Sequence, residues 1–570
     1  MAEILLSPGV LSREIDASFI AEQPPVLGAA IVGPTVKGPV GIPVTVTSYT
    51  DFVSRFGETE VVAGTGSFSY FTSITAYNYF QNGGESLLVT RVVSGTYGAA
   101  SASIKNFDDN VAFTLETISE GAIMNTGTDV GTNNSLVSAS IHSVRFQIVA
   151  PNTASGTFNL YIRKGDDDDK NPSILETFTG LSMDPLSENY VARRIGDYKF
   201  TQTLVDDEAS LQITGTYPNK SRYVKVGTVL TPTPQYLIGG IANPAYTGSI
   251  PDAANVDNIT GSFNGAAGAL IAGAKFYDQI DSTNIQGVGA NDYTASLQLL
   301  ASANDYQFNV LITPGLDYTN HSTQLDVVIA NTENRGDNVF VMDLGNATIS
   351  ASQVIEQAAL VDSSYAASYY PWLQTLDPAT KQYVFVPASV MIPGVYAYND
   401  KVAEPWFAPA GISRGGLSNV IRAASKLSQT MRDNLYQGKV NPVATFPGQG
   451  VVVYGNKTLQ TKASALDRIN VRRLMIALKG YIGQIANGLV FQQNNASTRN
   501  SFLAQVNPYL ESVQQRQGLY AFKVVMDDSI NNAAVIDRNE LVGQIYLQPT
   551  KTAEFIYLNF TLTPTGATFA

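Results

Sequence analysis

A change of texture divides this sequence of 570 residues into two kinds of structure. Up to about residue 94, apolar strand segments such as Ala29–Gly33 alternate with helical segments, one of which begins at Ser48 and ends at Gly57. From 94 to 249, glycine, threonine, serine and asparagine become frequent, and short alternating strands such as 144–149 replace the helical periodicity. Helix–strand alternation returns in the second half. Because such alternation is typical of α/β folds, and short alternating strands of all-β structure, we predict an α/β core interrupted by an inserted all-β region.

The predicted fold class is a multidomain α/β and α+β protein. It has an α/β core, an inserted all-β domain, and a C-terminal α+β domain with exchanged terminal strands. At about 150 residues per domain, a chain of this length is expected to form three or four domains. The predicted limits are an N-terminal arm at 1–25, a first part of the core at 26–94, the inserted β-rich domain at 95–249, a second part of the core at 250–440, a C-terminal domain at 441–548 and a C-terminal arm at 549–570.

Two long helices are predicted in the second half of the chain. The first has apolar residues at helical spacing over 417–435 and ends at Gly438. The second begins with a capping box at Ser464 and Asp467, followed by an apolar stripe. On the opposite face of this second helix we expect three basic residues, and elsewhere two further helices. The basic residues are Arg468, Arg472 and Lys479, and the further helices are a small-residue helix at 266–277 and a shorter one from Pro508 to Gly518.

Both ends of the chain read as strands that lack a partner nearby in the sequence. The run 10–15 has no hairpin partner before Pro24, and the last of three C-terminal strand signals covers 554–562. A terminal strand is an edge, and an edge without a partner in its own fold tends to pair with another chain. We therefore predict that the protein polymerises by exchanging arms. The residues assigned to the two arm strands are Val10, Leu11, Arg13, Ile15, Ile556, Leu558, Phe560 and Leu562.

The composition excludes most classes of catalytic and metal site. Cysteine is absent, which removes thiolate metal sites, and only His142 and His321 could serve as a catalytic base. With 35 Lys and Arg against 48 Asp and Glu, the net charge of −13 disfavours nucleic-acid binding. The longest smooth apolar stretch, 266–274, is far below the roughly 20 residues that a membrane span needs. We therefore expect no cofactor, no nucleic-acid partner, no membrane insertion, and a protein that is made in a cytoplasm.

Several local patterns that resemble chemical motifs are interpreted as structural. The run 450–458 has a phosphate-loop outline with its lysine out of register, so we interpret it as a strand. The acidic run 166–169 lacks the glycine and distal glutamate of a calcium loop, so we interpret it as a solvated hairpin tip. His142 and His321 are expected on the surface, and Asp343, at a strand end, is expected to cap the start of a helix.

Short motifs on either side of 94–249 resemble those of the contractile phage tail sheath proteins. No single motif would suffice to establish the resemblance, but together the motifs extend over about 8–94 and 262–560. At 261–268, where members of that family often have a Gly-Gly-x-Asp-Gly turn, this sequence has Asn264-Gly265 instead. The motifs include Ser7-Pro8-Gly9-Val10, Ile31-Val32-Gly33-Pro34, Lys37-Gly38-Pro39, Asn284-Ile285-Gln286-Gly287, Thr313-Pro314-Gly315, Arg335-Gly336-Asp337, Val386-Pro387-Ala388-Ser389, Pro393-Gly394-Val395-Tyr396, Ala408-Pro409-Ala410-Gly411, Lys457-Thr458-Leu459 and Phe491-Gln492-Gln493-Asn494.

The resemblance implies a structural protein and not an enzyme. It implies six-subunit rings that stack around a tail tube protein, between a baseplate and a tail terminator, and that contract to drive the tube through the host envelope for genome ejection. The terminal arms would add strands to the C-terminal sheets of neighbouring subunits, and the insertion at 95–249 would project outward. The basic residues of the second long helix would be a candidate contact to the tube or to another subunit. The expected location is the virion tail, and the host cytoplasm during assembly.

Two alternatives remain open at this level. The first is the sheath of a contractile injection system that is not a phage. The second is a subtilisin-like hydrolase, because the family core resembles subtilisin in fold, although the scarcity of histidine argues against activity.

Overall fold

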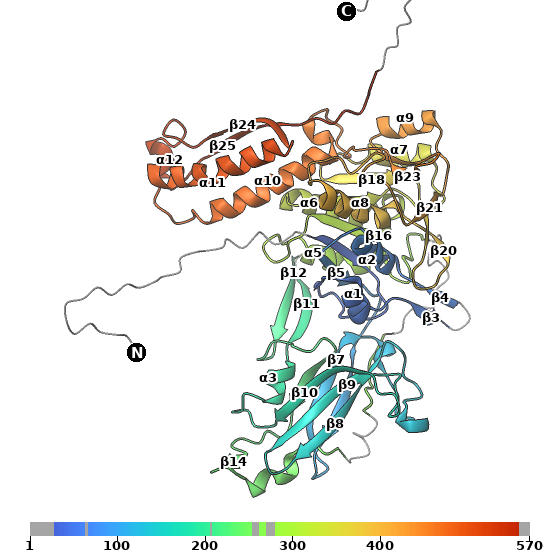
Figure 1. Ribbon diagram of the computed structural model, residues 1–570, viewed down its shortest axis with the longest axis vertical. Coiled ribbons are helices and arrows are strands. Elements are labelled where there is room, and N and C mark those ends of the chain that lie inside the picture. Colours follow the sequence, from blue (N-terminus) through green and yellow to red (C-terminus); the bar gives the residue numbers. More distant parts are fainter. Residues whose placement is uncertain (1–27, 63–65, 206–207, 254–260, 269–279, 558–570) are drawn as a thin grey trace, which may run out of the picture.

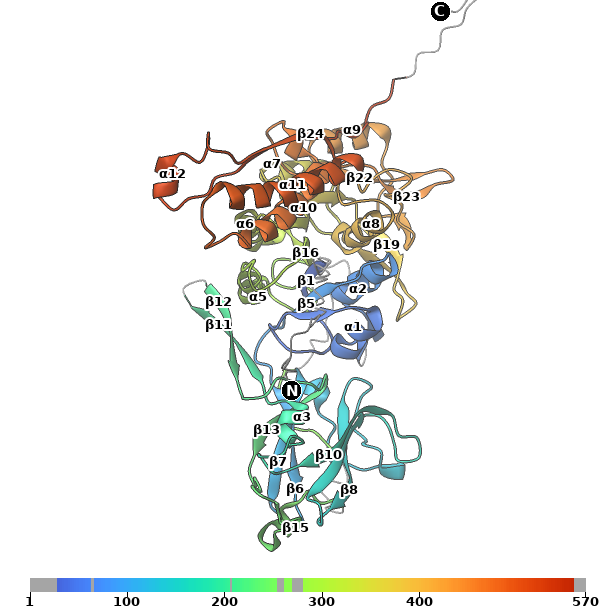
Figure 2. The ribbon, with the colours of Figure 1, turned by 60° about the vertical axis from the view of Figure 1, so that its left-hand side comes forward.

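The architecture is that of a mixed α/β protein with several separate sheets, as the sequence predicts. A β-rich region lies at one end, an α/β core in the middle, and a pair of long helices with two strands at the other end (Figures 1 and 2). The computed structural model describes residues 28–62, 66–205, 208–253, 261–268 and 280–557.

The core is built on an eight-stranded sheet that joins distant parts of the chain. Its middle strands run parallel, whereas the strand at each edge is antiparallel to its neighbour. Most middle strands are buried along their whole length, as expected of a parallel sheet covered on both faces. The strands are, in sheet order, β2 (Val44–Val46), β5 (Leu87–Arg91), β1 (Ala29–Gly33), β16 (Val310–Asp317), β17 (Val339–Asp343), β18 (Ala366–Tyr370), β22 (Asn441–Phe446) and β23 (Gly450–Val453).

Helices pack against this sheet and complete its hydrophobic core. Local signals set several of their ends: the Ser48 hydroxyl accepts a hydrogen bond from the Asp51 backbone at the start of α1, and Gly57 ends that helix, as predicted. Near the sheet lie α1 (Tyr49–Phe56), α2 (Phe71–Gln81), α5 (Thr294–Leu299), α6 (Tyr318–Arg335), α7 (Ala351–Ala359), α8 (Ala388–Val402) and α9 (Gln429–Gln437), together with the strands β19 (Leu373–Leu376), β20 (Tyr383–Val386), β21 (Val420–Ala423), β3 (Glu60–Val62) and β4 (Gly66–Phe68).

The β-rich region leaves the core after β5, and the chain returns to the same sheet at β16. It has a hydrophobic core of its own, to which Phe263 also contributes. The predicted domain limits are not tested by this arrangement and stay predictions. The region contains β6 (Ala99–Lys105), β7 (Val111–Glu120), β8 (Val144–Asn152), β9 (Thr157–Lys164), β10 (Ile174–Ser182), α3 (Val191–Ile195), β11 (Lys199–Val205), β12 (Glu208–Thr214), β13 (Val224–Val229), β14 (Leu237–Ile238) and β15 (Ile241–Ala242).

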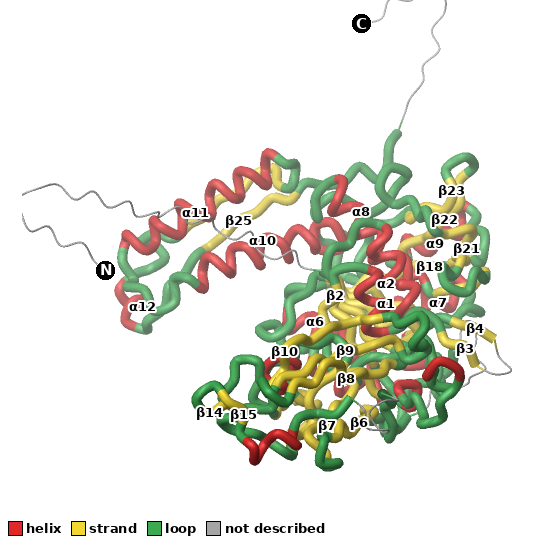
Figure 3. The backbone as a smooth tube through the Cα atoms, turned by 60° about the horizontal axis from the view of Figure 1, so that its bottom comes forward, coloured by secondary structure: helices red, strands yellow, loops and turns green. Residues whose placement is uncertain are grey.

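The C-terminal part projects from the core as two helices and a strand pair (Figure 3). Apolar side chains of both helices pack on one another, on Trp406 and on the inner face of the strands. The elements are α10 (Ile469–Asn487), α11 (Ala496–Gln515), β24 (Leu519–Val525), α12 (Ala533–Asp537) and β25 (Gln544–Pro549).

The prediction of a long helix over 417–435 is wrong. The segment forms strand β21 and, after a loop, the short helix α9. Strand β21 pairs with β19, and the backbone of Ala424 donates to the carbonyl of Trp372 at 2.7 Å. Ile421, which the periodicity assigns to the buried stripe, is 50% exposed. A strand partner elsewhere in the chain therefore overrides a helical pattern that is only local.

The helix predicted to start after Pro508 is also wrong in its limits, because α11 runs through this proline. Proline costs a helix one hydrogen bond and usually breaks it. Here Phe502, Val506, Leu510 and Val513 form one buried row across Pro508, and this burial outweighs the lost bond. The second long helix begins at Ile469, after a short 3₁₀ turn capped by Ser464, rather than at the predicted capping box. The helix predicted over 266–277 lies mostly outside the described residues, and 266–268 are not helical.

Candidate functional site

The strand pair β24–β25 presents two unextended edges. Among the described residues the two strands pair only with each other, with Phe522 opposite Leu547 and Lys523 opposite Tyr546. Phe522 and Leu547 face the helices, whereas Tyr520 and Tyr546 are 62% and 57% exposed on the outer face. On one edge the carbonyl of Tyr520 accepts from Gln514 Nε2 at 2.8 Å. A two-stranded sheet of this kind can be extended by a further strand.

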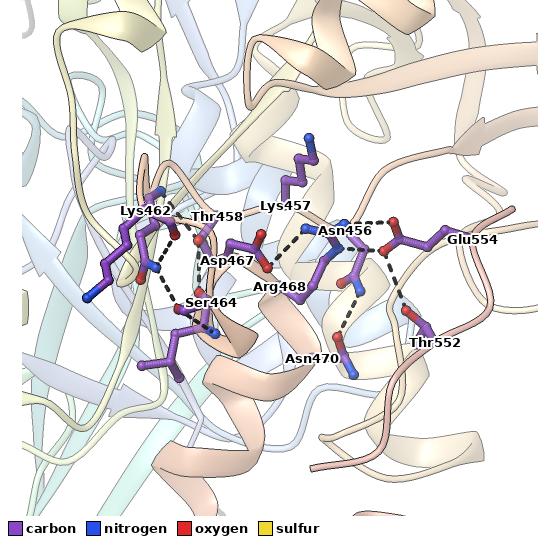
Figure 4. A network of polar contacts seen from close by, with 12 residues as sticks. Asn456, Lys457, Thr458, Lys462, Ser464, Asp467, Arg468, Asn470, Thr552 and Glu554 are labelled. Carbon is purple, nitrogen blue, oxygen red and sulfur yellow. Dashed lines mark hydrogen bonds and ion pairs between the residues drawn. The ribbon is translucent and has the colours of Figure 1, made fainter. Parts of the chain in front are cut away.

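The chain that follows β25 leaves this sheet and crosses to the core beside α9 (Figures 1 and 2). Its last ladder contact is the Thr550 backbone, which donates to the carbonyl of Gly518 at 3.1 Å. Glu554 then binds Arg468 at the start of α10 (Figure 4). It also accepts a hydrogen bond from the hydroxyl of Tyr436 in α9. The next three side chains, Phe555, Ile556 and Tyr557, are 70%, 75% and 88% exposed. Large apolar side chains in such exposed positions indicate a surface that another molecule covers.

Of the predicted arm residues, Ile556 alone lies in the described part of the chain. It is exposed, and 551–557 form no strand within the subunit. The strand predicted over 554–562 is therefore absent from the described residues 554–557. The others, Val10, Leu11, Arg13, Ile15, Leu558, Phe560 and Leu562, lie outside the described residues.

The three predicted basic contact residues do not share an exposed face. Arg472 is buried: its guanidinium donates to the carbonyl of Ser364 at 3.3 Å and lies 3.8 Å from the ring centre of Tyr365. Burial lowers the pKa of Arg472. The expectation of an outward polar face is therefore wrong for Arg472, because the loop before β18 covers that side of the helix. Lys479 is exposed, with Nζ 3.3 Å from the Tyr365 hydroxyl.

Arg468 is likewise engaged inside the subunit. Its Nε donates to Glu554 Oε1 at 2.6 Å and its Nη2 to Oε2 at 3.0 Å, while Asp467 lies 3.0 Å from Nη1. The role of the three residues as a tube or inter-subunit contact stays a prediction, and Lys479 is the member of the set that lies exposed. Sequence reasoning missed the partnership of Arg468 with Glu554, because 86 residues separate them and neither position carries a local signal.

The two histidines are buried and not on the surface, contrary to the prediction. His321 lies in α6, where Nδ1 accepts from the Asp317 backbone N–H at 3.1 Å and Nε2 donates to the carbonyl of Asp281 at 3.1 Å. His142 lies between the core and the β-rich region, where burial and the nearby Lys37 lower its pKa to about 4. His321 lies in the first turn of α6, where backbone groups of Asp317 and Asp281 enclose its ring, and this explains its burial.

Asp343 ends β17, and its side chain binds the first turn of α8, whose N-cap residue is Pro387. The predicted helix-start cap is therefore confirmed only in that Asp343 accepts a hydrogen bond from a backbone N–H of that turn. Its carboxylate accepts from the Ser389 backbone at 3.2 Å and from the Ser389 hydroxyl. Burial raises the pKa of Asp343 to about 7, against the opposing effect of the hydrogen bonds from Ser389. The pair lies inside the fold, since both residues are buried.

The acidic run 166–169 is only in part a solvated tip. Asp167 is buried, with its Oδ2 2.8 Å from Arg163 Nε and its Oδ1 3.6 Å from Arg145. The interpretation of the run 450–458 as a strand is confirmed for Gly450–Val453, which form β23, whereas 454–458 lie outside this strand. Within the described ranges, no group of three or more His, Cys, Asp or Glu side chains is placed to hold a metal ion. The same part of the chain contains no helix that is long and apolar enough to span a membrane.

Two family domains match the chain. Residues 286–459 match the phage tail sheath protein central domain, and 461–563 match the phage tail sheath C-terminal domain. The tail sheath protein of Vibrio phage KVP40 is 42% identical over 226 residues, which cover 40% of this chain and 33% of that protein. The tail sheath protein of Enterobacteria phage T4 is 39% identical over 229 residues, which cover 40% of this chain and 35% of that protein. The matched part of the chain thus spans about a third of the length of these curated relatives.

A similar fold occurs in a solved structure. The crystal structure of a sheath tail protein from Listeria innocua aligns with 92% of this chain and 95% of its own, with a TM-score of 0.51 and 11% sequence identity. At this identity the likeness concerns the fold alone.

Proposed function

The chain belongs to the contractile phage tail sheath family, to whose two domains residues 286–563 are matched, and from this premise we propose that it is the structural subunit of a contractile sheath. Subunits would stack as six-membered rings around a tail tube and contract to drive the tube through the host envelope. The proposed partners are other copies of the chain, the tube protein, the baseplate and the tail terminator. The proposed location is the virion tail, after assembly in the host cytoplasm.

One observation carries this proposal: an extendable strand pair is followed in the chain by an exposed apolar segment, and this segment has no strand partner among the described residues. In the part of the chain that the structure describes, β24 and β25 pair with no third strand, and Phe555, Ile556 and Tyr557 follow them in exposed positions. A segment of one subunit that adds to the strand pair of another would satisfy both surfaces. Repetition of this head-to-tail contact generates rings and helices rather than closed dimers.

We also propose that the chain has no catalytic role. Both nitrogens of His321 are engaged by backbone groups, so this histidine has no nitrogen left to activate a nucleophile. A surface pocket of about 470 Å³ between α2, α8 and β23 is lined by one ionisable side chain, Tyr398. A serine-directed fluorophosphonate should therefore leave the protein unlabelled, and stoichiometric labelling of one serine would favour the hydrolase alternative.

Electron microscopy of the purified protein tests the main proposal. The full chain should form hollow, striated polymers, whereas a chain truncated after Ala553 should keep its helical circular dichroism and form none. Tubes of normal length from the truncated chain would contradict the proposal that the terminal segment is needed for assembly. Failure of the full chain to polymerise with purified tube protein would count against the sheath itself. Capsid and terminase genes next to the coding gene would separate a phage from another contractile injection system.

A further inference from the structure

We propose that Glu554 is a positioning residue that fixes the direction in which the C-terminal segment leaves the subunit. The Glu554 latch consists of Glu554, Arg468 and Tyr436. The latch itself is a property of the single subunit. Only its consequence, that the segment reaches a neighbouring subunit in the correct direction, rests on the proposed function.

Four hydrogen bonds converge on the Glu554 carboxylate: three from Arg468 and Tyr436, and a longer one of 3.5 Å from the hydroxyl of Thr552, two residues earlier in the same segment. Figure 4 shows those from Arg468 and Thr552. Arg468 donates through Nε at 2.6 Å and through Nη2 at 3.0 Å, and the hydroxyl of Tyr436 donates to Oε2 at 2.8 Å. The bidentate contact with Arg468 fixes the plane of the carboxylate as well as its position. The side chains of Arg468 and Glu554 are 25% and 18% exposed, so the pair is partly removed from water. It is therefore a stronger contact than an exposed ion pair.

The arginine end of the latch is held on a rigid platform. Arg468 forms an antiparallel bridge with Lys457, and this bridge is flanked by bonds from the Thr458 backbone to the Asp467 carbonyl at 3.1 Å and from the Ile469 backbone to the Asn456 carbonyl at 3.0 Å. Lys457 Nζ in turn donates to the carbonyl of Tyr436 at 2.8 Å. The guanidinium is therefore presented by backbone that is fixed on both sides, and not by a loose helix end.

The latch connects residues 551–557 to the core, whereas the strand that precedes them, β25, belongs to the C-terminal strand pair. Tyr436 of the latch belongs to α9 at the side of the core sheet. Within the described part of 551–557, the hydrogen bonds and ion pairs that reach the rest of the chain all involve Glu554. The exposed residues Phe555–Tyr557 come directly after it, so their starting point and direction depend on this one side chain.

Trypsin cleavage after Lys551 tests the latch without any need for assembly. Lys551 is exposed and lies three residues before Glu554, and cleavage there requires 551–557 to detach from the platform. Cleavage by a protease follows the population of the detached form. In the unassembled full chain, Glu554→Gln should accelerate release of the peptide 552–570, followed by mass spectrometry, by about tenfold. Tyr436→Phe removes one of the three bonds that tie Glu554 to the rest of the chain, and should accelerate this release about threefold.

The matched control is Glu540→Gln, which breaks the exposed pair between Arg538 and Glu540 at 2.8 Å in the same part of the chain. It should change cleavage after Lys551 by less than twofold. Thermal melts followed by circular dichroism identify any variant that fails to fold. If Glu554→Gln fails to fold, the cleavage rate of Tyr436→Phe is used to test the latch. Unchanged cleavage in both latch variants would overturn the proposal.

Assembly provides the second measurement. Glu554→Gln should reduce the mean length of the polymers that wild-type protein forms, whereas Glu540→Gln should not. Accelerated cleavage together with polymers of normal length would overturn the positioning role while leaving the sheath proposal intact. If cleavage is accelerated in the latch variants but the wild-type chain forms no polymers, the result counts against the sheath proposal and still supports the latch.

Discussion

The hydroxyl of Ser389, in the first turn of α8, donates to the buried carboxylate of Asp343 at the end of β17, and the Ser389 backbone donates to the same carboxylate at 3.2 Å. This contact ties a core strand to the helix that packs on its sheet. The group that accepts both bonds is a carboxyl whose pKa burial raises to about 7. The folded protein therefore holds a proton on Asp343 in a range of pH in which the unfolded chain has released it.

A pH dependence of stability follows from Asp343. Because its folded pKa is raised from 3.8 to about 7, its contribution to stability is fully present below pH 4 and is lost as the pH rises to 7. The loss amounts to about 1.4 kcal/mol per pH unit at most. Asp343→Asn keeps an oxygen that accepts from Ser389 but cannot ionise. Urea unfolding of unassembled protein should show the variant gaining on wild type between pH 4 and 7. Parallel curves for the two proteins would contradict this assignment.

Arg91 should be needed to hold the β-rich region against the core. It is fully buried, and Nη1 donates at 2.7 Å to the carbonyl of Gly38 in the core and at 2.7 Å to that of Glu120 in β7. Arg91→Leu leaves these carbonyls without their charged donor, and we expect a loss of about 3 kcal/mol in the free energy of unfolding. Arg222→Ala breaks the exposed pair with Asp51 that also links β-rich region and core, and should cost less than about 1 kcal/mol. Equal losses for the two variants would argue against Arg91 as the main link.

Asp167 should stabilise the hairpin tip through arginine and not through calcium. Its carboxylate lies 2.8 Å from Arg163 in a buried pair. Asp167→Asn should lower the free energy of unfolding by about 2 kcal/mol, because it removes the charge opposite Nε and Nη2 of the buried Arg163, whereas Asp169 keeps its ion pair with Nη1 at 2.9 Å. Millimolar calcium should leave the melting temperature of wild type unchanged. A calcium-dependent rise that is lost in Asp167→Asn would show that the run binds the ion.

Lys479 is the basic residue of α10 that tests an external contact. Its side chain is exposed, and its Nζ lies 3.3 Å from the Tyr365 hydroxyl. If it faces the acidic surface of a tube or a neighbouring subunit, Lys479→Glu should reduce co-sedimentation with assembled tubes, with a stronger effect at low salt. Lys170→Glu, on an exposed loop of the β-rich region, is the charge-matched control. Equal co-sedimentation of both variants and wild type would remove Lys479 from the contact.

The sequence predicted only those parts of the candidate site that neighbouring residues in the chain determine. The terminal segment after β25 stands out because apolar residues alternate there next to a proline, and Ile556 is indeed exposed. The partners of Arg468 and Arg472 could not be read in this way. A basic residue on a predicted helix is expected to face solvent, because the sequence does not show which other segment will cover it. The partner of Arg468 is Glu554, 86 residues away, and the partner of Arg472 is Ser364, 108 residues away.

The sequence by itself determined the elements whose causes are local: the buried strands β1 and β17 from their apolar runs, and α1 from the Ser48 cap and Gly57. It also carried the family motifs. Only the tertiary structure decided that 420–423 is a strand, that α11 continues through Pro508 and that His321 is buried. In each case the energy comes from a partner distant in the chain, such as a neighbouring strand, a facing helix or a covering loop. Burial and pairing with such partners outweigh local preferences of about a kcal/mol for most residues and of about 3 kcal/mol for a proline inside a helix. The local sequence does not show which distant segment will supply the partner.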